Sequence, residues 1–416
     1  MIKVLHFADA HIDLARQGRH DPQSGLPMRV LDFLKALDTI VDAAVEQKVD
    51  LVIFAGDAYR DRTPAPTYQR EWGRRIMRLS SAGIMTLLVI GNHDVSPASG
   101  RAHALQEFDT LQVPNVRVIS KPCLLGPDDL NGLPLQVIGI PWLNRSAFAA
   151  SLDNEKQSNE SLNDQIEREL TALVESLMDQ LDPKLPAILT AHATVQGAFY
   201  GSERTIMLGA DFVLPGSLVR DPRLDYVALG HIHNHQDLNK DGHPHIVYPG
   251  SIERVDFGEA EEQKIFVTAE IERGHAEMQE HLLRGRKFFD HVAKLENPET
   301  VNQDILKAFP GEKQLADAIF RLVVYYPREW DALIDESDIR RKAESAFEFH
   351  FIRRPQIQAR IRLPQDKSVS EIPPIEVLNR YWDVIPAKGR DTQALNKLAE
   401  DIFETAQRGQ SEKEAG

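Results

Sequence analysis

The chain has 416 residues, of which 42% are hydrophobic, and a formal net charge of -15 at pH 7. The length predicts two or three domains with a sizeable core. The acidity argues against a general nucleic-acid coat protein, whose surface would be basic. The single cysteine, Cys123, excludes an internal disulfide framework and a cysteine-rich zinc site.

The apolar runs are short and interrupted by charged residues, so no segment is expected to cross a membrane. The first residues, MIKVLHFADAH, lack the basic region and the longer apolar stretch of a signal peptide. We therefore expect a cytoplasmic protein that does not contact a membrane.

The first two thirds of the chain alternate short apolar runs with amphipathic helical patterns. Leucine and valine keep helical spacing from Leu31 to Val45, and similar spacing runs from Ile166 to Leu181. Six apolar runs are predicted as buried strands: 2–7, 50–55, 84–90, 135–140, 186–191 and 225–230. The runs 245–250 and 264–271 are expected to form a closing hairpin. This alternation predicts a layered α/β/α domain over residues 1–274.

The character of the sequence changes near residue 275. A strand-like run at 288–295, a helical pattern at 298–309 and a strand-like run at 318–326 predict a small α+β domain over 275–363. Residues 364–416 are expected to form a linker and a short helical tail. Three apolar residues of this tail share one face: Leu395, Leu398 and Ile402.

Five of the six predicted strands are followed at once by residues that commonly bind metals. Ligands in an open α/β sheet gather beyond the carboxyl ends of the strands, so folding should bring these side chains together. The fourth strand, which ends in IGIPW, carries none. The candidate ligands are Asp9, His11, Asp57, Asn92, His192, His231 and His233.

Seven ligands are too many for one four-coordinate metal. Two metals that share a bridging carboxylate can use them, and such pairs, about 3.5–4 Å apart, serve in-line displacement at phosphorus. Oxygen and imidazole ligands without thiolate suit manganese, iron or zinc.

The order of motifs, D-x-H, GD, GNHD, H and GHxH over residues 9–233, resembles the calcineurin-like metallophosphoesterases. A finer similarity is to the nuclease subunits of the SbcCD exonucleases (SbcD), carried by FADAHID, by GNHD followed by SPASGRA, and by YVALGHIH with YPGSIERVDFGE. This resemblance implies a metallophosphoesterase nuclease domain followed by a capping domain. It implies two divalent ions, most commonly manganese, and cleavage of DNA in repair, recombination and replication.

The same resemblance implies activity as a double-strand exonuclease and as a single-strand or hairpin endonuclease. It also implies a coiled-coil ATPase partner of the SbcC type, bound by the helical tail, and a homodimer of this chain within a heterotetramer.

Carried over residue by residue, the resemblance assigns one metal to Asp9, His11, Asp57 and His233. The other metal falls to Asn92, His192 and His231, with Asp57 bridging. His93 becomes the catalytic residue that faces the scissile phosphate. Asp94 either orients His93 or caps the next helix.

Some relatives in this family carry a second active-site histidine three residues after the bridging aspartate, where this chain has Arg60. Arginine cannot act as a general base, although it can contact phosphate. Arg60 and Arg62 are therefore candidate substrate-binding residues, and a solvated surface is the alternative. His6 is expected in the core or behind the ligands, and His235 at the surface or behind them.

We predict a two-metal phosphodiesterase that acts on DNA. A first alternative is a metallophosphoesterase for nucleotides or phosphoproteins, since the same core serves all of these substrates. A second alternative is a non-catalytic scaffold that binds DNA ends or an ATPase, against which His93 and the complete ligand set argue.

Overall fold

The computed structural model describes residues 1–14, 19–95, 101–143, 162–200, 213–356, 373–384, 392, 394–400 and 402–403. The chain divides into two compact units, Met1–Phe288 and Phe289–Gly416. The sequence placed a boundary after residue 274, whereas strand β14 (His275–Leu282) pairs antiparallel with β13 (Ile265–Glu272) of the first unit. None of the described helices is long and apolar enough to span a bilayer.

Two six-stranded sheets form the centre of the first unit. The first sheet runs β14-β13-β1-β2-β3-β4, and the second runs β11-β12-β10-β7-β6-β5. The first sheet contains β1 (Ile2–Phe7), β2 (Leu51–Phe54), β3 (Met85–Val89) and β4 (Val116–Ile119). The second contains β5 (Cys123–Leu125), β6 (Gln136–Ile140), β7 (Ala187–His192), β10 (Tyr226–Gly230), β11 (Gln236–Asp237) and β12 (His245–Tyr248). All six strands predicted from apolar runs are present.

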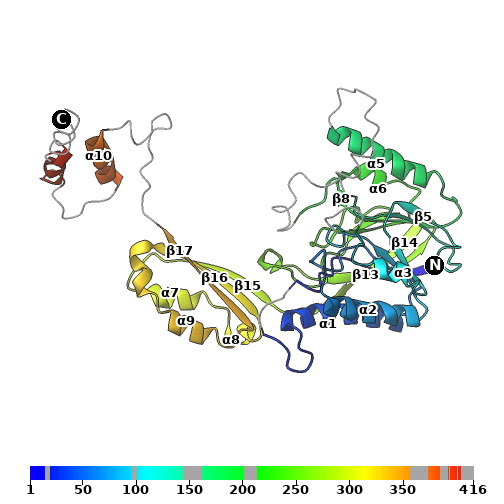
Figure 1. The fold of residues 1–416 in the computed structure, drawn as a ribbon, viewed down its shortest axis with the longest axis horizontal. Coiled ribbons are helices and arrows are strands. Elements are labelled where there is room, and N and C mark those ends of the chain that lie inside the picture. The colour runs from blue at the N-terminus through cyan, green and yellow to red at the C-terminus, as the bar shows by residue number, and fades with distance from the viewer. Residues whose placement is uncertain are drawn as a thin grey trace. The chain divides into compact units, whose positions relative to one another are not determined.

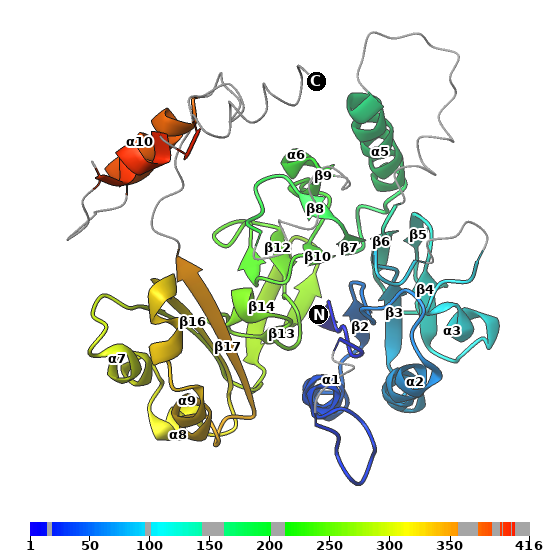
Figure 2. The ribbon, with the colours of Figure 1, turned by 60° about the vertical axis from the view of Figure 1, so that its left-hand side comes forward.

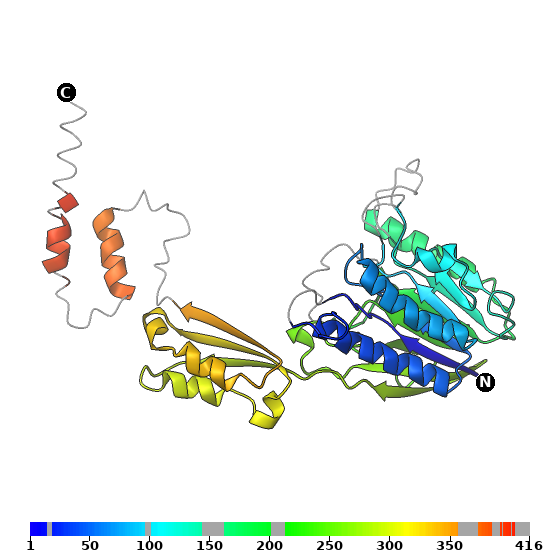
Figure 3. The same ribbon diagram turned by 60° about the horizontal axis from the view of Figure 1, so that its bottom comes forward.

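Helices cover the outer face of each sheet. Helices α1 (Met28–Glu46) and α2 (Pro66–Ser81) lie side by side against the first sheet (Figure 3). Helices α5 (Leu162–Met178) and α6 (Gly216–Val219) pack on the second sheet, on the opposite side of this unit (Figure 1). The helical spacings that predicted α1 and α5 are confirmed. The short elements are α3 (Gln106–Thr110), β8 (Thr194–Val195), β9 (Val213–Leu214) and the 3₁₀ helix η2 (Phe257–Glu259).

The strands are apolar on both faces because each sheet is covered by helices on one face and by the other sheet on the other face. Leu5 of β1 joins the core under α1 and α2, whereas its neighbour Val4 joins a core between the two sheets. Ile188 of β7 packs in this inner core, and Leu189 packs under α5. The α/β class is confirmed, and the inner layer consists of two face-to-face sheets rather than the single sheet of an α/β/α sandwich.

The predicted closing hairpin at 245–250 and 264–271 is wrong. Strand β12 pairs parallel with β10 in the second sheet, and β13 pairs antiparallel with β1 in the first. The segment between them therefore passes from one sheet to the other. Ser251 of this segment forms a bridge with Ala8, directly beyond the end of β1.

The second unit has a three-stranded sheet of β15 (Phe288–Lys294), β16 (Ile319–Pro327) and β17 (Glu348–Gln356). Helices α7 (Val301–Lys307), α8 (Glu312–Leu315) and α9 (Glu336–Lys342) lie against one face of it (Figure 2). Its core includes Phe320, Leu322, Ile305 and Ile339. The 3₁₀ helix η3 (Arg328–Leu333) follows β16, and helix α10 (Pro374–Val384) lies further along the chain, after β17. Leu395, Leu398 and Ile402 in the tail are exposed.

His6 joins the two sheets of the first unit through polar contacts. Its Nε2 donates to the carbonyl of Leu229 at 3.1 Å, and its Nδ1 accepts from the hydroxyl of Tyr226 at 3.2 Å. Burial lowers the pKa of the His6 imidazole to about 3. His6 is therefore a neutral core residue, as the sequence predicted.

This environment predicts an acid-dependent loss of stability from His6. Between pH 6.5 and pH 3 the unfolded chain binds a proton on His6 that the folded chain excludes, so stability falls as the pH drops through this window. At pH 5.5 the loss is about 1.4 kcal/mol relative to pH 7.5. Urea unfolding of wild type and His6→Gln in the presence of EDTA should show that the variant lacks this part of the pH dependence. An identical pH dependence in both proteins would contradict the assignment.

Candidate metal centre

The structure brings the seven candidate ligands together at one end of both sheets. Asp9 and His11 follow β1, Asp57 follows β2, and Asn92 follows β3, all in the first sheet. His192 ends β7, and His231 and His233 follow β10, both in the second sheet. Because the two sheets face each other, their strand ends meet at a single site.

The backbone around the ligands is strongly turned. Asp9, His11, Asp57 and His231 all have positive φ, at 51°, 38°, 64° and 100°. Such conformations cost about 1–3 kcal/mol each and persist where the surrounding structure enforces them. The glycine of the GNHD motif is required by close packing, since a Cβ on Gly91 would lie 2.1 Å from Oδ1 of Asp57.

One group of ligands contains Asp9, His11 and His233, whose ligand atoms lie within 4.8 Å of one another. Nδ1 of His11 donates to the carbonyl of Tyr59 at 3.2 Å, and Nδ1 of His233 donates to Glu259 at 2.8 Å. The Nε2 atoms of both rings therefore keep their lone pairs, and these two atoms lie 3.1 Å apart. Two nitrogens bound to one metal at about 2.1 Å would lie about 3.0 Å apart at a right angle and about 3.4 Å apart in a tetrahedron, so this geometry fits a divalent ion.

A second group contains Asp9, Asp57 and His192. Nε2 of His192 lies 3.4 Å from Oδ2 of Asp57 and 2.9 Å from Oδ1 of Asn92. Nδ1 of His231 lies 3.1 Å from the same oxygen of Asn92. Oδ2 of Asp57 is also 3.8 Å from Nε2 of His11 in the first group. Asp9 thus belongs to both groups, and Oδ2 of Asp57 lies within 4 Å of a histidine nitrogen from each of them.

Burial and charge act in opposite directions on the two buried carboxylates. Burial raises the pKa of Asp9 to about 7. Burial would also raise the pKa of Asp57, but His192, His93 and His11 outweigh it and hold that pKa well below its usual value. Asp57 in turn overcomes the effect of burial on His192 and raises its pKa to about 9. A bound cation would favour ionised carboxylates and neutral imidazoles throughout this cluster.

Asp94 supports the backbone around Asp57. Its Oδ2 accepts from the backbone N–H groups of Asp57 and Gly91, both at 2.9 Å, and its Oδ1 accepts from Ala58 at 3.1 Å. Asp94 is fully buried. Both interpretations of Asp94 from the sequence, as an orienting group for His93 and as a helix cap, are therefore wrong.

His93 lies beside Asp57 at the edge of a cleft. Its backbone N–H donates to Oδ1 of Asp57 at 2.8 Å, and its Nδ1 donates to the carbonyl of Arg60 at 2.9 Å. The ring meets the His11 ring edge to face, with centroids 5.1 Å apart. Burial lowers the pKa of His93, and the negative charge of Asp57 opposes this shift only in part.

The cleft has a volume of about 500 Å³ and is lined by Asp13, Leu14, Arg60, Asp61, Arg62, Thr63 and His93. Its two acids are engaged by backbone groups. Asp13 accepts from the N–H groups of Arg60 and Asp61, and Asp61 accepts from the N–H of Thr63. The guanidinium groups of Arg60 and Arg62 balance the charges of these two acids in the lining of the cleft.

Two further residues belong to the site, and the sequence did not assign a role to either. Trp142 follows β6, and its ring centroid lies 5.0 Å from that of His231 and 6.2 Å from that of His192. Glu259 in η2 accepts the hydrogen bond from His233. The only signals in the sequence were a tryptophan at the end of the fourth strand and an acid within YPGSIERVDFGE.

His235 does not join the ligands. Its Nδ1 donates to the carbonyl of Tyr248 at 2.9 Å, and its Nε2 lies 3.0 Å from the exposed carboxylate of Glu280. His235 is therefore a partly exposed neighbour of the ligand set.

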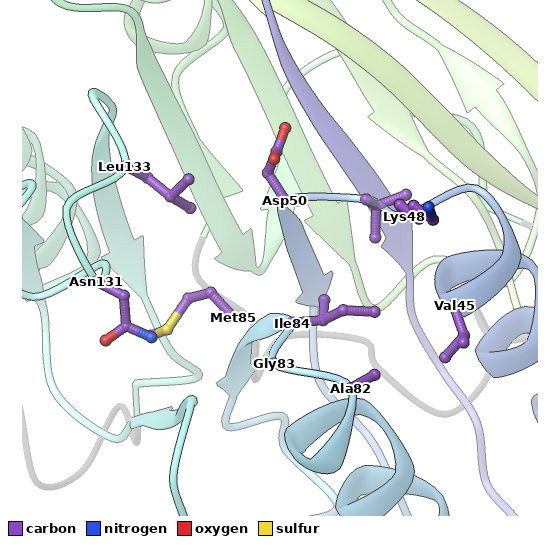
Figure 4. A pocket seen from close by; sticks show the side chains of 10 residues that line it. Val45, Lys48, Asp50, Ala82, Gly83, Ile84, Met85, Asn131 and Leu133 are labelled. Atoms are coloured by element: carbon purple, nitrogen blue, oxygen red, sulfur yellow. The ribbon is translucent and has the colours of Figure 1, made fainter.

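A second cavity of about 490 Å³ lies at the opposite ends of β2 and β3 (Figure 4). Its lining includes Lys48 and Asp50, which precede β2, and Ile84, which precedes β3. It contains none of the candidate ligands.

The sequence of the chain is similar to a known protein family and to individual members of it. The sequence profile described as "Calcineurin-like phosphoesterase" matches residues 2–235. The "DNA double-strand break repair protein Mre11" of Archaeoglobus fulgidus is 26% identical over 262 residues, which cover 62% of this chain and 52% of that protein. The chain thus spans about half the length of that relative.

A bacterial relative is matched over a larger share of its length. The SbcD component of the nuclease SbcCD from Escherichia coli K12 is 26% identical over 294 residues, which cover 68% of each chain. Among solved structures, a dimetal phosphatase from Danio rerio has 12% identity and a TM-score of 0.40. That alignment covers 68% of this chain and 97% of the phosphatase.

The contacts of Asp94 predict a large loss of stability when its carboxylate is removed. Asp94→Ala leaves three buried N–H groups without acceptors, each at about 1–3 kcal/mol, so the free energy of unfolding should fall by about 3 kcal/mol or more. Urea unfolding measures this loss. Asp128→Ala, at an exposed aspartate, should change stability by about 0.5 kcal/mol or less. Equal midpoints for the two variants would refute the bracing role of Asp94.

Proposed function

Because the chain belongs to the calcineurin-like phosphoesterases, we propose that it hydrolyses phosphodiester bonds of DNA with two divalent ions, most commonly manganese. The observation that carries the proposal is the convergence of the seven candidate ligands, Asp57 among them, next to His93 and a cleft with two arginines. The names of the archaeal and bacterial relatives, a DNA repair protein and a nuclease component, support DNA as the substrate.

The proposed ligand sets are those that the family resemblance implies, and the two groups of side chains support them in part, since Asp9 falls in both groups. Asp9, His11 and His233 would hold one ion, and Asn92, His192 and His231 would hold the other. Asp57 would be shared by both, because its Oδ2 lies near Nε2 of both His11 and His192. Two bound divalent ions would supply Lewis acidity towards the phosphate and a nucleophile from water at neutral pH.

His93 is the proposed catalytic residue. Since its Nδ1–H is held by the carbonyl of Arg60, its Nε2 is the atom left for the substrate. A phosphodiester in the neighbouring cleft brings negative charge to this nitrogen and favours the protonated ring. Protonated His93 can then stabilise the transition state or give its proton to the leaving oxygen.

Arg60 and Arg62 are the proposed contacts to the DNA backbone. They line the cleft beside His93, and the neighbouring acids Asp13 and Asp61 are engaged by backbone N–H groups. Guanidinium groups at this place can form ion pairs and hydrogen bonds with the phosphates of a DNA backbone.

We further propose that the chain works with a coiled-coil ATPase of the SbcC type, as a homodimer within a heterotetramer. The name of the bacterial relative describes it as one subunit of a nuclease. Leu398 and Ile402 of the tail are each 57% exposed, as expected for an apolar face that binds a partner helix. The second unit, which begins at Phe289, would then act as the capping domain.

Replacing His93 tests the catalytic assignment. His93→Ala should lower the rate of Mn²⁺-dependent degradation of linear duplex DNA by about 100-fold to 10,000-fold, because general acid catalysis contributes about that much. Calorimetric titration should still find two Mn²⁺ ions per chain, since His93 is not a ligand. A variant that degrades duplex ends at the wild-type rate would refute this mechanism.

His235→Ala is the matched control in the same assays. It removes a nearby histidine that lies outside the ligand set, so both the cleavage rate and the metal stoichiometry should stay at wild-type values.

If wild type hydrolyses small phosphomonoesters and leaves duplex DNA intact, with or without an SbcC-type ATPase, the proposal of a nuclease fails. Two bound ions without any phosphoesterase activity would instead indicate a scaffold.

Arg60→Ala should weaken DNA binding in a salt-dependent manner. Loss of one phosphate contact reduces the slope of log K against log salt concentration by about one. Fluorescence anisotropy with labelled duplex DNA, in the His93→Ala background, measures this slope. Arg168→Ala is the control, because Arg168 pairs with Glu169 on α5, on the outer side of the second sheet. Equal changes in slope for both arginines would show a general effect of charge.

A further inference from the structure

The ligand His233 is held by a buried carboxylate. Nδ1 of His233 donates to Oε1 of Glu259 at 2.8 Å, and both side chains are almost completely buried. The other carboxylate oxygen, Oε2, accepts from the hydroxyl of Ser251 and the N–H of Val255, both at 3.0 Å. Glu259 is thus fixed on both oxygens, and its orientation towards His233 is set by the segment that connects the two sheets.

A buried lysine balances the charge of Glu259. Nζ of Lys264 lies 2.7 Å from Oε2 of Glu259 and 2.7 Å from a carboxylate oxygen of Glu262. Lys264 also donates to the backbone carbonyl of His233 at 3.2 Å. The lysine therefore contacts both Glu259 and the residue that Glu259 orients. A buried carboxylate without such a partner would carry a large desolvation cost.

Other histidines of the site are oriented differently. The Nδ1 atoms of His11, His192 and His93 donate to the backbone carbonyls of Tyr59, Ala55 and Arg60. A backbone carbonyl is neutral, whereas the carboxylate of Glu259 carries charge and increases the electron density of the ring it binds. His233 is therefore polarised by a charged side chain, while those three rings are held by neutral groups.

We propose that Glu259 is a positioning residue that fixes the tautomer of His233 and strengthens its Nε2 as a metal ligand. The proton on Nδ1 is held by Glu259, so Nε2 keeps its lone pair towards the space shared with His11 and Asp9. This inference rests on the proposed two-metal function. It adds that one of the two ion positions depends on a residue 26 positions away from its ligand.

A purely structural role is the competing explanation. In that case Glu259 serves only to neutralise Lys264, and any loss of that ion pair should have the same consequence. Glu262 separates the two explanations, because it pairs with the same lysine at the same distance of 2.7 Å. Glu262→Gln perturbs the lysine and leaves the hydrogen bond from Nδ1 of His233 to Glu259 in place.

The test is calorimetric titration of Mn²⁺ into the metal-stripped full-length protein, with thermal unfolding measured alongside. Glu259→Gln keeps an oxygen acceptor for Nδ1 of His233 but loses the charge, so one of the two ions should bind about 10-fold to 100-fold more weakly. Glu259→Leu removes the acceptor as well and should bind a single ion. Glu262→Gln should bind two ions with wild-type affinity.

The outcomes separate this inference from the function on which it rests. Wild-type affinity for both ions in Glu259→Gln would overturn the positioning role of Glu259. Equal weakening in Glu259→Gln and Glu262→Gln would also overturn it, in favour of the ion pair. If Glu259→Leu does not fold, the two glutamine variants still decide. A wild-type protein that binds fewer than two ions would contradict the two-metal site itself.

Discussion

The burial of two carboxylates, Asp9 and Asp57, where the two sheets meet, is the constraint on which the rest of the structure depends. A buried carboxylate is tolerated only where hydrogen bonds or opposite charges replace the lost water. Here the N–H groups of His231 and His93 donate to Asp9 and Asp57, and imidazoles surround both acids. The set is rich in metal-binding groups, and two groups of its ligand atoms lie close enough together to hold a metal ion.

The two-sheet architecture and the candidate site are therefore parts of one arrangement. Ligands from β1, β2 and β3 can meet ligands from β7 and β10 only because the sheets pack face to face around a common apolar core. His6 ties β1 to β10 close to the strand ends, and the segment with Ser251 and Glu259 crosses from the second sheet to the first behind His233. Rigid packing below the site thus holds its strained loops.

The sequence predicted what depends on local patterns. Apolar runs predicted the strands, and polar residues directly after them predicted which side chains gather at one site, because both signals lie within a few neighbouring residues. The second sheet was missed because an apolar strand looks the same whether a helix or another sheet covers it. Strand β14 was missed because an edge strand with one solvated face carries many charges. Asp94 and Glu259 act through hydrogen bonds to residues 37 and 26 positions away, which no local pattern reveals.

The histidines of the site differ in whether a substitution at a neighbouring residue can change the orientation and basicity of the imidazole ring. Backbone carbonyls orient His11, His192 and His93, and a side-chain substitution cannot remove a backbone carbonyl. His233 is oriented by Glu259, which itself contacts Ser251 and Lys264. Single substitutions at these residues can therefore alter the strength of Nε2 of His233 as a metal ligand. In the proposed two-metal site, the ion position near His233 would thus be adjustable without any change to a ligand. If the two positions differ in affinity for a metal ion, this asymmetry in the supporting contacts is the physical reason that the structure offers.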